Sequence, residues 1–176
     1  MTFSKRIQYF LKYKLKQCNL KRKVFAKESG ISYSSVNNLI NGIKSHPELK
    51  SILKIANYFR CSLDEVIGRD KYAISSEKKL HFSHITMDDI SCNLKTFIKT
   101  KLNEINTTPN QLSSNIGFSS DTIPLFLKED DTKKNLSSAV AVALADYFQV
   151  SLDEMVGRIK PNTSDNDEPS QQHTNE

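Results

Sequence analysis

The sequence has few of the residues on which several protein classes depend. Its three cysteines, Cys18, Cys61 and Cys92, are too few and odd in number for a disulfide framework, so we expect a reduced protein. Glycine and proline, at five each, are scarce for a β-rich or collagen-like chain. No apolar run reaches the roughly 18 residues of a membrane span, and the first residues lack the apolar core of a secretory signal. These absences predict a cytoplasmic protein with no membrane partner.

What the sequence does contain is an uneven distribution of charge. The 176 residues are 38% hydrophobic and 26% charged, which is typical of a globular protein with one ordinary domain or two small ones. Residues 1–74 hold 15 Lys and Arg against 5 Asp and Glu, whereas residues 75–159 hold 9 against 11 and residues 160–176 hold 1 against 4. A basic first half indicates a polyanionic partner, although lysine-rich helices can also be merely solvated.

An internal repeat predicts the domain organisation. Residues 59–69 recur as residues 148–158 at a spacing of 89, and residues 30–32 match residues 117–119 at a spacing of 87. Two copies at this period indicate a tandem duplication of a small domain rather than a solenoid. We therefore expect a domain at 1–70, a polar linker at 71–85, a second domain at 86–159 and a disordered tail at 160–176.

Apolar spacing predicts an all-α fold. Helices are expected at 3–18, 21–29, 32–41 and 47–59 and from 62 in the first copy, and from 86, 108 and 151 in the second. Pro47 suits the first turn of its helix. Cys18 is expected on the apolar face of the first helix, and Cys61 is interpreted as a small core residue rather than a nucleophile.

Residues 22–40 have the features of two short helices that meet at a wide angle. Ala26 is small enough for the crossing point, and Gly30 permits a left-handed turn. Apolar residues on the inner side of the second helix are expected to pack it against the core. The residues left pointing outward are short or planar hydrogen-bonding types that suit base edges in a major groove, namely Ser32, Tyr33, Ser34, Asn37 and Asn38.

This pattern resembles the Cro/lambda-repressor-type helix-turn-helix family, also called XRE-like regulators, over about residues 7–69. The resemblance implies a five-helix, lambda-repressor-like domain whose third helix enters the major groove. By position it implies base or backbone contacts from Arg22, Ser32, Tyr33, Ser34 and Asn38, a flanking contact from Asn37 and a phosphate contact from Lys44; Lys23 is a further candidate for DNA binding. Simpler roles are also open: Ser32 can act as a helix cap, Tyr33 can pack against a neighbour, and the lysines can be solvated.

The second copy keeps the apolar positions but departs from the pattern of contact residues. Ser113 replaces Ala26, and the outward positions become Ser120, Asp121, Pro124 and Leu125. With Ser119 as the cap, Pro124 falls past the first turn and removes a helical hydrogen bond. Acidic residues 129–131 replace the loop that contains Lys44. We expect this copy to serve interaction or dimerisation instead of reading DNA.

Other chemistry has little support in the sequence. His81 and His84 are interpreted as solvated, so no metal, no cofactor and no enzymatic activity are expected. The predicted function is sequence-specific binding of double-stranded DNA and transcriptional regulation, with repression expected, by a nucleoid-associated homodimer. One alternative is an antitoxin or phage-type repressor that binds a protein partner through residues 86–159. The other is a protein–protein adaptor that does not bind DNA.

Overall fold

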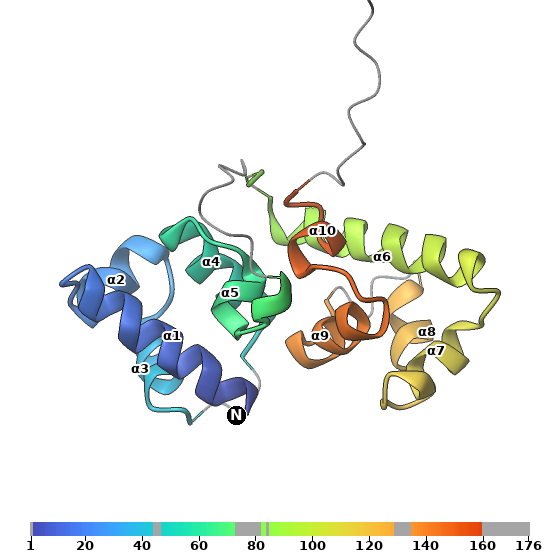
Figure 1. Cartoon of the computed structure of the whole chain (residues 1–176), viewed down its shortest axis with the longest axis horizontal. Helices are drawn as coiled ribbons and strands as arrows, with labels where there is room; N and C mark the ends of the chain where they lie inside the picture. Colours follow the sequence, from blue (N-terminus) through green and yellow to red (C-terminus); the bar gives the residue numbers. More distant parts are fainter. Residues whose placement is uncertain (1, 44–46, 73–81, 84, 129–134, 160–176) are drawn as a thin grey trace, which may run out of the picture.

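A computed structural model of the chain describes residues 2–43, 47–72, 82–83, 85–128 and 135–159. These residues form helices and no strand, which confirms the all-α expectation (Figure 1). The helices are α1 (Phe3–Gln17), α2 (Arg22–Ser29), α3 (Tyr33–Ile40), α4 (Leu49–Phe59), α5 (Leu63–Ile67), the 3-10 helix η1 (Asp70–Tyr72), α6 (Met87–Glu104), α7 (Pro109–Asn115), α8 (Thr122–Leu127), α9 (Ser138–Tyr147) and α10 (Leu152–Met155). Lys44, His81, His84, residues 129–131 and the tail from 160 lie outside the described residues.

The N-terminal half, residues 2–72, packs around one group of apolar side chains. Helix α1 lies against α3 and α5, while α2 contacts α3 and α4. Phe25 on α2 is fully buried and stacks on Phe59 at the end of α4, with ring centroids 5.4 Å apart. Burial of these side chains is the main favourable contribution to folding, because short helices such as α2 and α3 are only marginally stable alone.

The C-terminal half, residues 82–159, repeats local features of the N-terminal half at the spacings seen in the sequence. Asn19 and Asn106 both adopt left-handed backbone angles, with φ of 48° and 49°, after α1 and α6. Phe10 packs edge-on against Phe59 at 5.9 Å, and their counterparts Phe97 and Phe148 do the same at 5.6 Å. The repeated sequence positions therefore have similar local structure.

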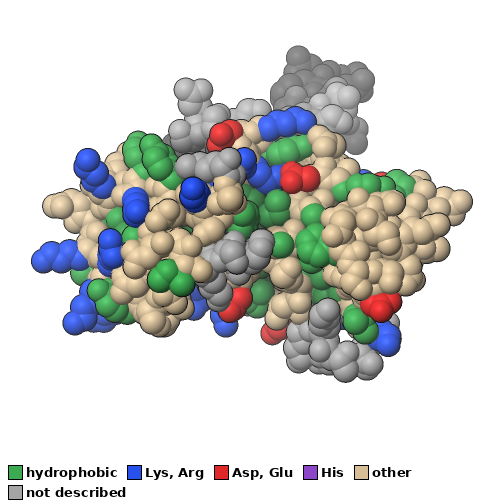
Figure 2. Space-filling view, turned by 90° about the horizontal axis from the view of Figure 1, so that it is seen from below, with side chains coloured by type: hydrophobic (Ala, Val, Ile, Leu, Met, Phe, Trp, Pro, Cys, Tyr) green, Lys and Arg blue, Asp and Glu red, His purple; other side chains and the backbone are tan. Residues whose placement is uncertain are grey.

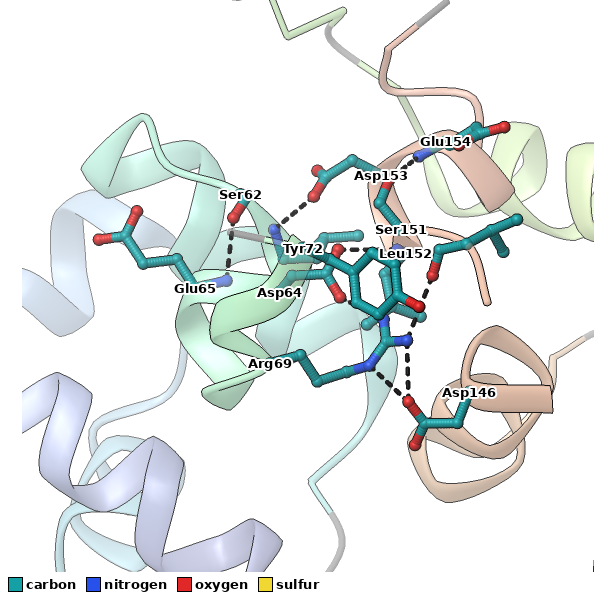
Figure 3. Close-up of polar contacts among 12 residues, drawn as sticks. Ser62, Asp64, Glu65, Arg69, Tyr72, Asp146, Ser151, Leu152, Asp153 and Glu154 are labelled. Carbon is teal, nitrogen blue, oxygen red and sulfur yellow. Dashed lines mark hydrogen bonds and ion pairs between the residues drawn. The ribbon is translucent and has the colours of Figure 1, made fainter. Parts of the chain in front are cut away.

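The two halves meet through α5 and α10, which face each other at the centre of the molecule (Figure 1). The Asp64 carboxylate accepts a hydrogen bond of 2.8 Å from the Leu152 backbone N–H, and the Asp153 carboxylate accepts one of 2.8 Å from the Leu63 N–H (Figure 3). Asp64 also forms an ion pair with Arg69. This contact joins the two sets of helices through buried polar groups.

Burial raises the pKa of the Asp64 carboxyl to about 6, although Arg69 acts in the opposite direction. Burial likewise raises the pKa of Asp153, against the effect of Arg158. Taking such charges out of water therefore offsets much of the attraction within each ion pair. We infer that these pairs specify how the two halves fit together more than they add net stability.

Three details of the N-terminal half concern residues named from the sequence. The prediction that Cys18 lies on the apolar face was wrong: it is exposed, because α1 ends at Gln17 and the chain turns at Asn19. Cys61 is buried as predicted, and burial raises its pKa to about 12, which keeps the thiol protonated. Pro47 lies just before its helix rather than in the first turn, because Glu48 is the N-cap of α4.

Pro124 does not interrupt its helix in the way that the sequence suggested. Helix α8 has Asp121 as its N-cap and begins at Thr122, so Pro124 is its third residue. The backbone nitrogens of the first turn have no carbonyl partner within the helix, so proline loses no hydrogen bond there. The later start makes α8 shorter than α3: α8 has 6 residues and α3 has 8.

Candidate nucleic-acid interface

The turn between α2 and α3 depends on Gly30. Its φ of 65° is left-handed, and its N–H bonds to the Ala26 carbonyl, as expected of a helix C-cap. Ile31 then continues into the core, where only 6% of its surface is exposed. This sharp reversal allows α3 to start immediately after α2 and to leave one side of α3 facing solvent.

We predict that Gly30→Ala lowers the free energy of unfolding by about 1–2 kcal/mol, the usual cost of a left-handed conformation for a residue with a Cβ. The added Cβ has room, since its nearest contact is the Lys54 ammonium at 3.5 Å. The penalty is therefore conformational. Gly30→Asn is the matched control, because asparagine tolerates this region better. Urea denaturation measures both, and an equal loss for the two variants contradicts the explanation.

The outward side of α3 carries the polar residues that the sequence indicated. Ser32 is the N-cap, and its hydroxyl accepts the Ser35 N–H at 3.1 Å, so its role as a cap is established in the structure. Tyr33 is 51% exposed, and Ser34 and Asn38 are also exposed. Val36, on the opposite side of the helix, is fully buried. The helix therefore presents an aromatic ring, a hydroxyl and an amide to solvent while its other side holds it in the core.

The first residues of α2 lie beside this surface. Arg22 begins α2, is exposed, and reaches the Asn37 side-chain oxygen of α3 at 3.4 Å. Asn37 is half-buried, which fits a flanking position better than a base-reading one. Lys23 is exposed next to Arg22. Lys44 lies outside the described residues, so its predicted phosphate contact stays a prediction.

Both ends of α3 are fixed by side chains that the sequence reading did not identify. The Gln8 amide of α1 donates to the Ile40 carbonyl at the C-terminal end of α3 at 2.7 Å. The Lys54 ammonium of α4 donates to the Gly30 carbonyl in the turn that precedes α3. These bonds link sequence-distant positions, and such links leave no local signal. They hold α3 at a set angle, as a recognition element requires.

A basic groove runs alongside the N-terminal end of α2 and was not predicted either. It is lined by Lys12 and Lys16 of α1 and by Lys21 and Arg22, with Ile40 of α3 at its edge. Lys12 and Lys16 are four residues apart, so they share one side of α1; this spacing was the available signal. Arg22 joins this groove to α3 through its contact with Asn37, and four cations in such a position are suited to phosphate oxygens.

The basic character of the surface is stronger over the N-terminal half. In Figure 2, Lys and Arg side chains gather over the left, N-terminal part, while polar uncharged groups and backbone cover most of the right part. On α8 the outward positions are Asp121, Pro124 and Leu125; Asp121 is exposed and Leu125 is 37% exposed. This side of α8 therefore has neither the amides nor the cations of the α2–α3 surface.

Other kinds of site find little support among the described residues. No cluster of three or more His, Cys, Asp or Glu side chains with the arrangement of a metal site is found there. Within the same residues, no helix combines the length and the apolar character needed to cross a bilayer.

Comparison with known proteins agrees with this geometry. The helix-turn-helix family model matches residues 11–66, which include α2, the turn and α3. An uncharacterized HTH-type transcriptional regulator of Rickettsia prowazekii (strain Madrid E) is 39% identical over 72 residues, covering 39% of this chain and 78% of the relative. Another from Rickettsia conorii (strain ATCC VR-613 / Malish 7) is 39% identical over 72 residues, with 66% of that relative covered. No solved structure matches significantly. This chain belongs to the helix-turn-helix family of transcriptional regulators.

Proposed function

We propose that this protein binds duplex DNA sequence-specifically through α3 and regulates transcription by repression. The observation that carries the proposal is the exposed row of Tyr33, Ser34 and Asn38 beside the basic groove. Side chains of this type read base edges in the major groove, while cations beside them neutralise phosphates and set the orientation of the protein on the duplex. Binding of this kind makes the protein nucleoid-associated.

Selection of bound duplexes from a random library, followed by affinity measurement, tests the proposal on the full chain. We expect an enriched site that binds at least ten times more tightly than a scrambled duplex of equal length. The affinity is expected to fall steeply with salt, because every phosphate contact releases a counterion. Equal affinity for selected and scrambled duplexes would refute sequence-specific binding and leave the adaptor function as the better account.

The basic groove leads to a separate prediction for Lys12→Ala. We expect weaker binding of selected and scrambled duplexes by the same factor, and a salt slope smaller by about 1, because one phosphate contact is lost. Lys99→Ala is the matched control: Lys99 lies 87 residues further on, is exposed on α6 and does not line the groove. A change of sequence preference in Lys12→Ala, or an equal effect of Lys99→Ala, contradicts the assignment.

We further propose that residues 1–70 and 86–159 are two copies of one domain and that the second copy serves interaction. The matched backbone angles of Asn19 and Asn106 and the matched aromatic pairs support a common ancestry. The partly apolar side of α8, whose one charged outward residue is Asp121, supports an interaction role, since exposed apolar groups with few cations are suited to protein partners. The occupant that we propose is a second copy of this chain, which supplies a second α3 for a two-fold site.

Light scattering with and without a selected duplex tests the homodimer. We expect two chains per duplex, with half-sites about one helical turn apart. Leu125→Ala is expected to weaken pairing without changing the affinity of one chain for a single half-site. A full chain that remains monomeric both free and on a two-fold duplex would contradict the homodimer, while leaving DNA reading by α3 intact.

A further inference from the structure

The contact between α5 and α10 is reciprocal in its hydrogen bonds. Asp64 accepts from the Leu152 N–H, and Asp153, its counterpart 89 residues later, accepts from the Leu63 N–H; both bonds are 2.8 Å long. Leu63 and Leu152 are themselves 89 residues apart. Each side therefore uses the same carboxylate and the same backbone donor.

The two arginines extend this reciprocity. Each one forms an ion pair with the aspartate five residues before it in the sequence. Arg69 also donates to the Val150 carbonyl at 3.2 Å, and Arg158 donates to the carbonyl of Cys61, the counterpart of Val150, at 3.3 Å.

The same two guanidinium groups reach matched positions near the ends of α9 and α4. Arg69 bonds to the Asp146 carboxylate at 2.8 Å, and Arg158 bonds to the side-chain oxygen of Asn57, the counterpart of Asp146, at 3.0 Å. Three kinds of contact thus cross between the halves twice, once in each direction, and the ion pair within each side also occurs twice. The relation in which residue i contacts j while j contacts i is that of a two-fold interface between identical subunits.

Nothing in the chemistry of one side prevents it from pairing with itself. Residues 62–69 and 151–158 differ only at Val66 against Met155 and Ile67 against Val156. The α5 side carries the Asp64 carboxylate, the Arg69 guanidinium and the Leu63 N–H, which has no carbonyl partner within its own helix. These groups include both the donors and the acceptors that the contact uses. On each side the arginine pairs with its own aspartate, which offsets the repulsion between Asp64 and Asp153 that contributes to the raised pKa of Asp64.

We propose that α5 carries a self-complementary pairing surface, made by Cys61, Leu63, Asp64 and Arg69 with Asn57 of α4, whose partner is a second copy of the same surface. In the intact chain, α10 occupies it, so the C-terminal half takes the place of a second subunit. When α10 is displaced, α5 pairs with α5 of another chain through the same bonds. This inference goes beyond DNA binding and stands without it.

The test uses the full chain with Asp153→Arg, which removes the acceptor for Leu63 and places a cation beside Arg158. We expect the average mass in light scattering to rise at least twofold relative to wild type at the same protein concentration. The matched control is the double variant Asp64→Arg/Asp153→Arg. It damages α10 equally but lacks the Asp64 carboxylate on α5, and its average mass is expected to equal that of wild type.

Val150→Arg is the second variant, because Val150 is only half-buried and lies against Arg69, so it weakens the pairing without removing a buried carboxylate. The same rise is expected. Hydrogen–deuterium exchange of peptides from residues 2–72 follows the helices of the N-terminal half in all variants. Two results would overturn the proposal. One is a wild-type mass for both Asp153→Arg and Val150→Arg while those helices are retained. The other is equal association of the double variant, which would indicate non-specific contact between exposed apolar surfaces.

Discussion

Asn38→Ala is expected to weaken binding of the selected duplex by about fivefold to 150-fold, equivalent to about 1–3 kcal/mol, and to relax the preference at one base pair. Asn38 is exposed on the outward side of α3, and its amide can both donate and accept at a base edge. The backbone position of α3 does not depend on it, because Val36 and Leu39 are buried on the other side. The loss is therefore expected in recognition and not in stability.

Asn103→Ala is the matched control for this prediction, since Asn103 is exposed near the end of α6. It removes the same amide from a helix surface without touching α3. Affinities for the selected duplex and for single-base variants of it provide the measurement. If Asn38→Ala weakens selected and scrambled duplexes by one common factor, Asn38 contacts the backbone rather than a base.

The second large effect is expected from Asp64→Ala, which should lower the free energy of unfolding by about 3–5 kcal/mol. The substitution leaves the buried Arg69 guanidinium without its nearest carboxylate and the Leu152 N–H without its acceptor. Unpartnered buried groups cost more than the pair contributes when intact. The loss is expected to appear as a lower urea midpoint for the whole chain, because α5 and α10 belong to one core.

Two further variants separate the causes of this loss. Asp64→Asn keeps a side-chain oxygen for the Leu152 N–H, so we expect a smaller loss than for Asp64→Ala. Asp121→Ala removes an exposed carboxylate that makes no capping hydrogen bond although Asp121 is the N-cap of α8, so its effect is expected to stay within about 0.5 kcal/mol. An Asp64→Ala loss no larger than that of Asp121→Ala would mean that the α5–α10 contact is dispensable.

The parts of the fold that could be predicted from the sequence are those with a local cause. Gly30 identified the left-handed turn, Ser32 identified the start of α3, and the spacing of Val36 and Leu39 separated its buried side from its exposed side. Each of these depends on residues within one turn of one another, where backbone preferences and apolar periodicity act directly.

What could not be predicted depends on contacts across the fold. Gln8 and Lys54 fix α3 from other helices, and Asp64 and Asp153 act across 88 to 90 residues. The repeat indicated that residues 59–69 and 148–158 resemble each other, but it did not indicate that they pair. Pro124 was misjudged because α8 is capped by Asp121, two residues after the expected Ser119, which moves Pro124 from the fifth helical position to the third, where a proline removes no hydrogen bond.

The central claim, that α3 reads DNA and α8 does not, is tested most directly by photo-crosslinking from matched positions. Tyr33 on α3 and Ser120, its counterpart 87 residues later, are both exposed. Each is replaced in turn by a photoreactive phenylalanine in the full chain, which is then irradiated on the selected duplex. We predict crosslinks to bases from position 33 and none above the scrambled-duplex background from position 120. Crosslinks from position 120 alone, or equal yields from both positions, would contradict the account.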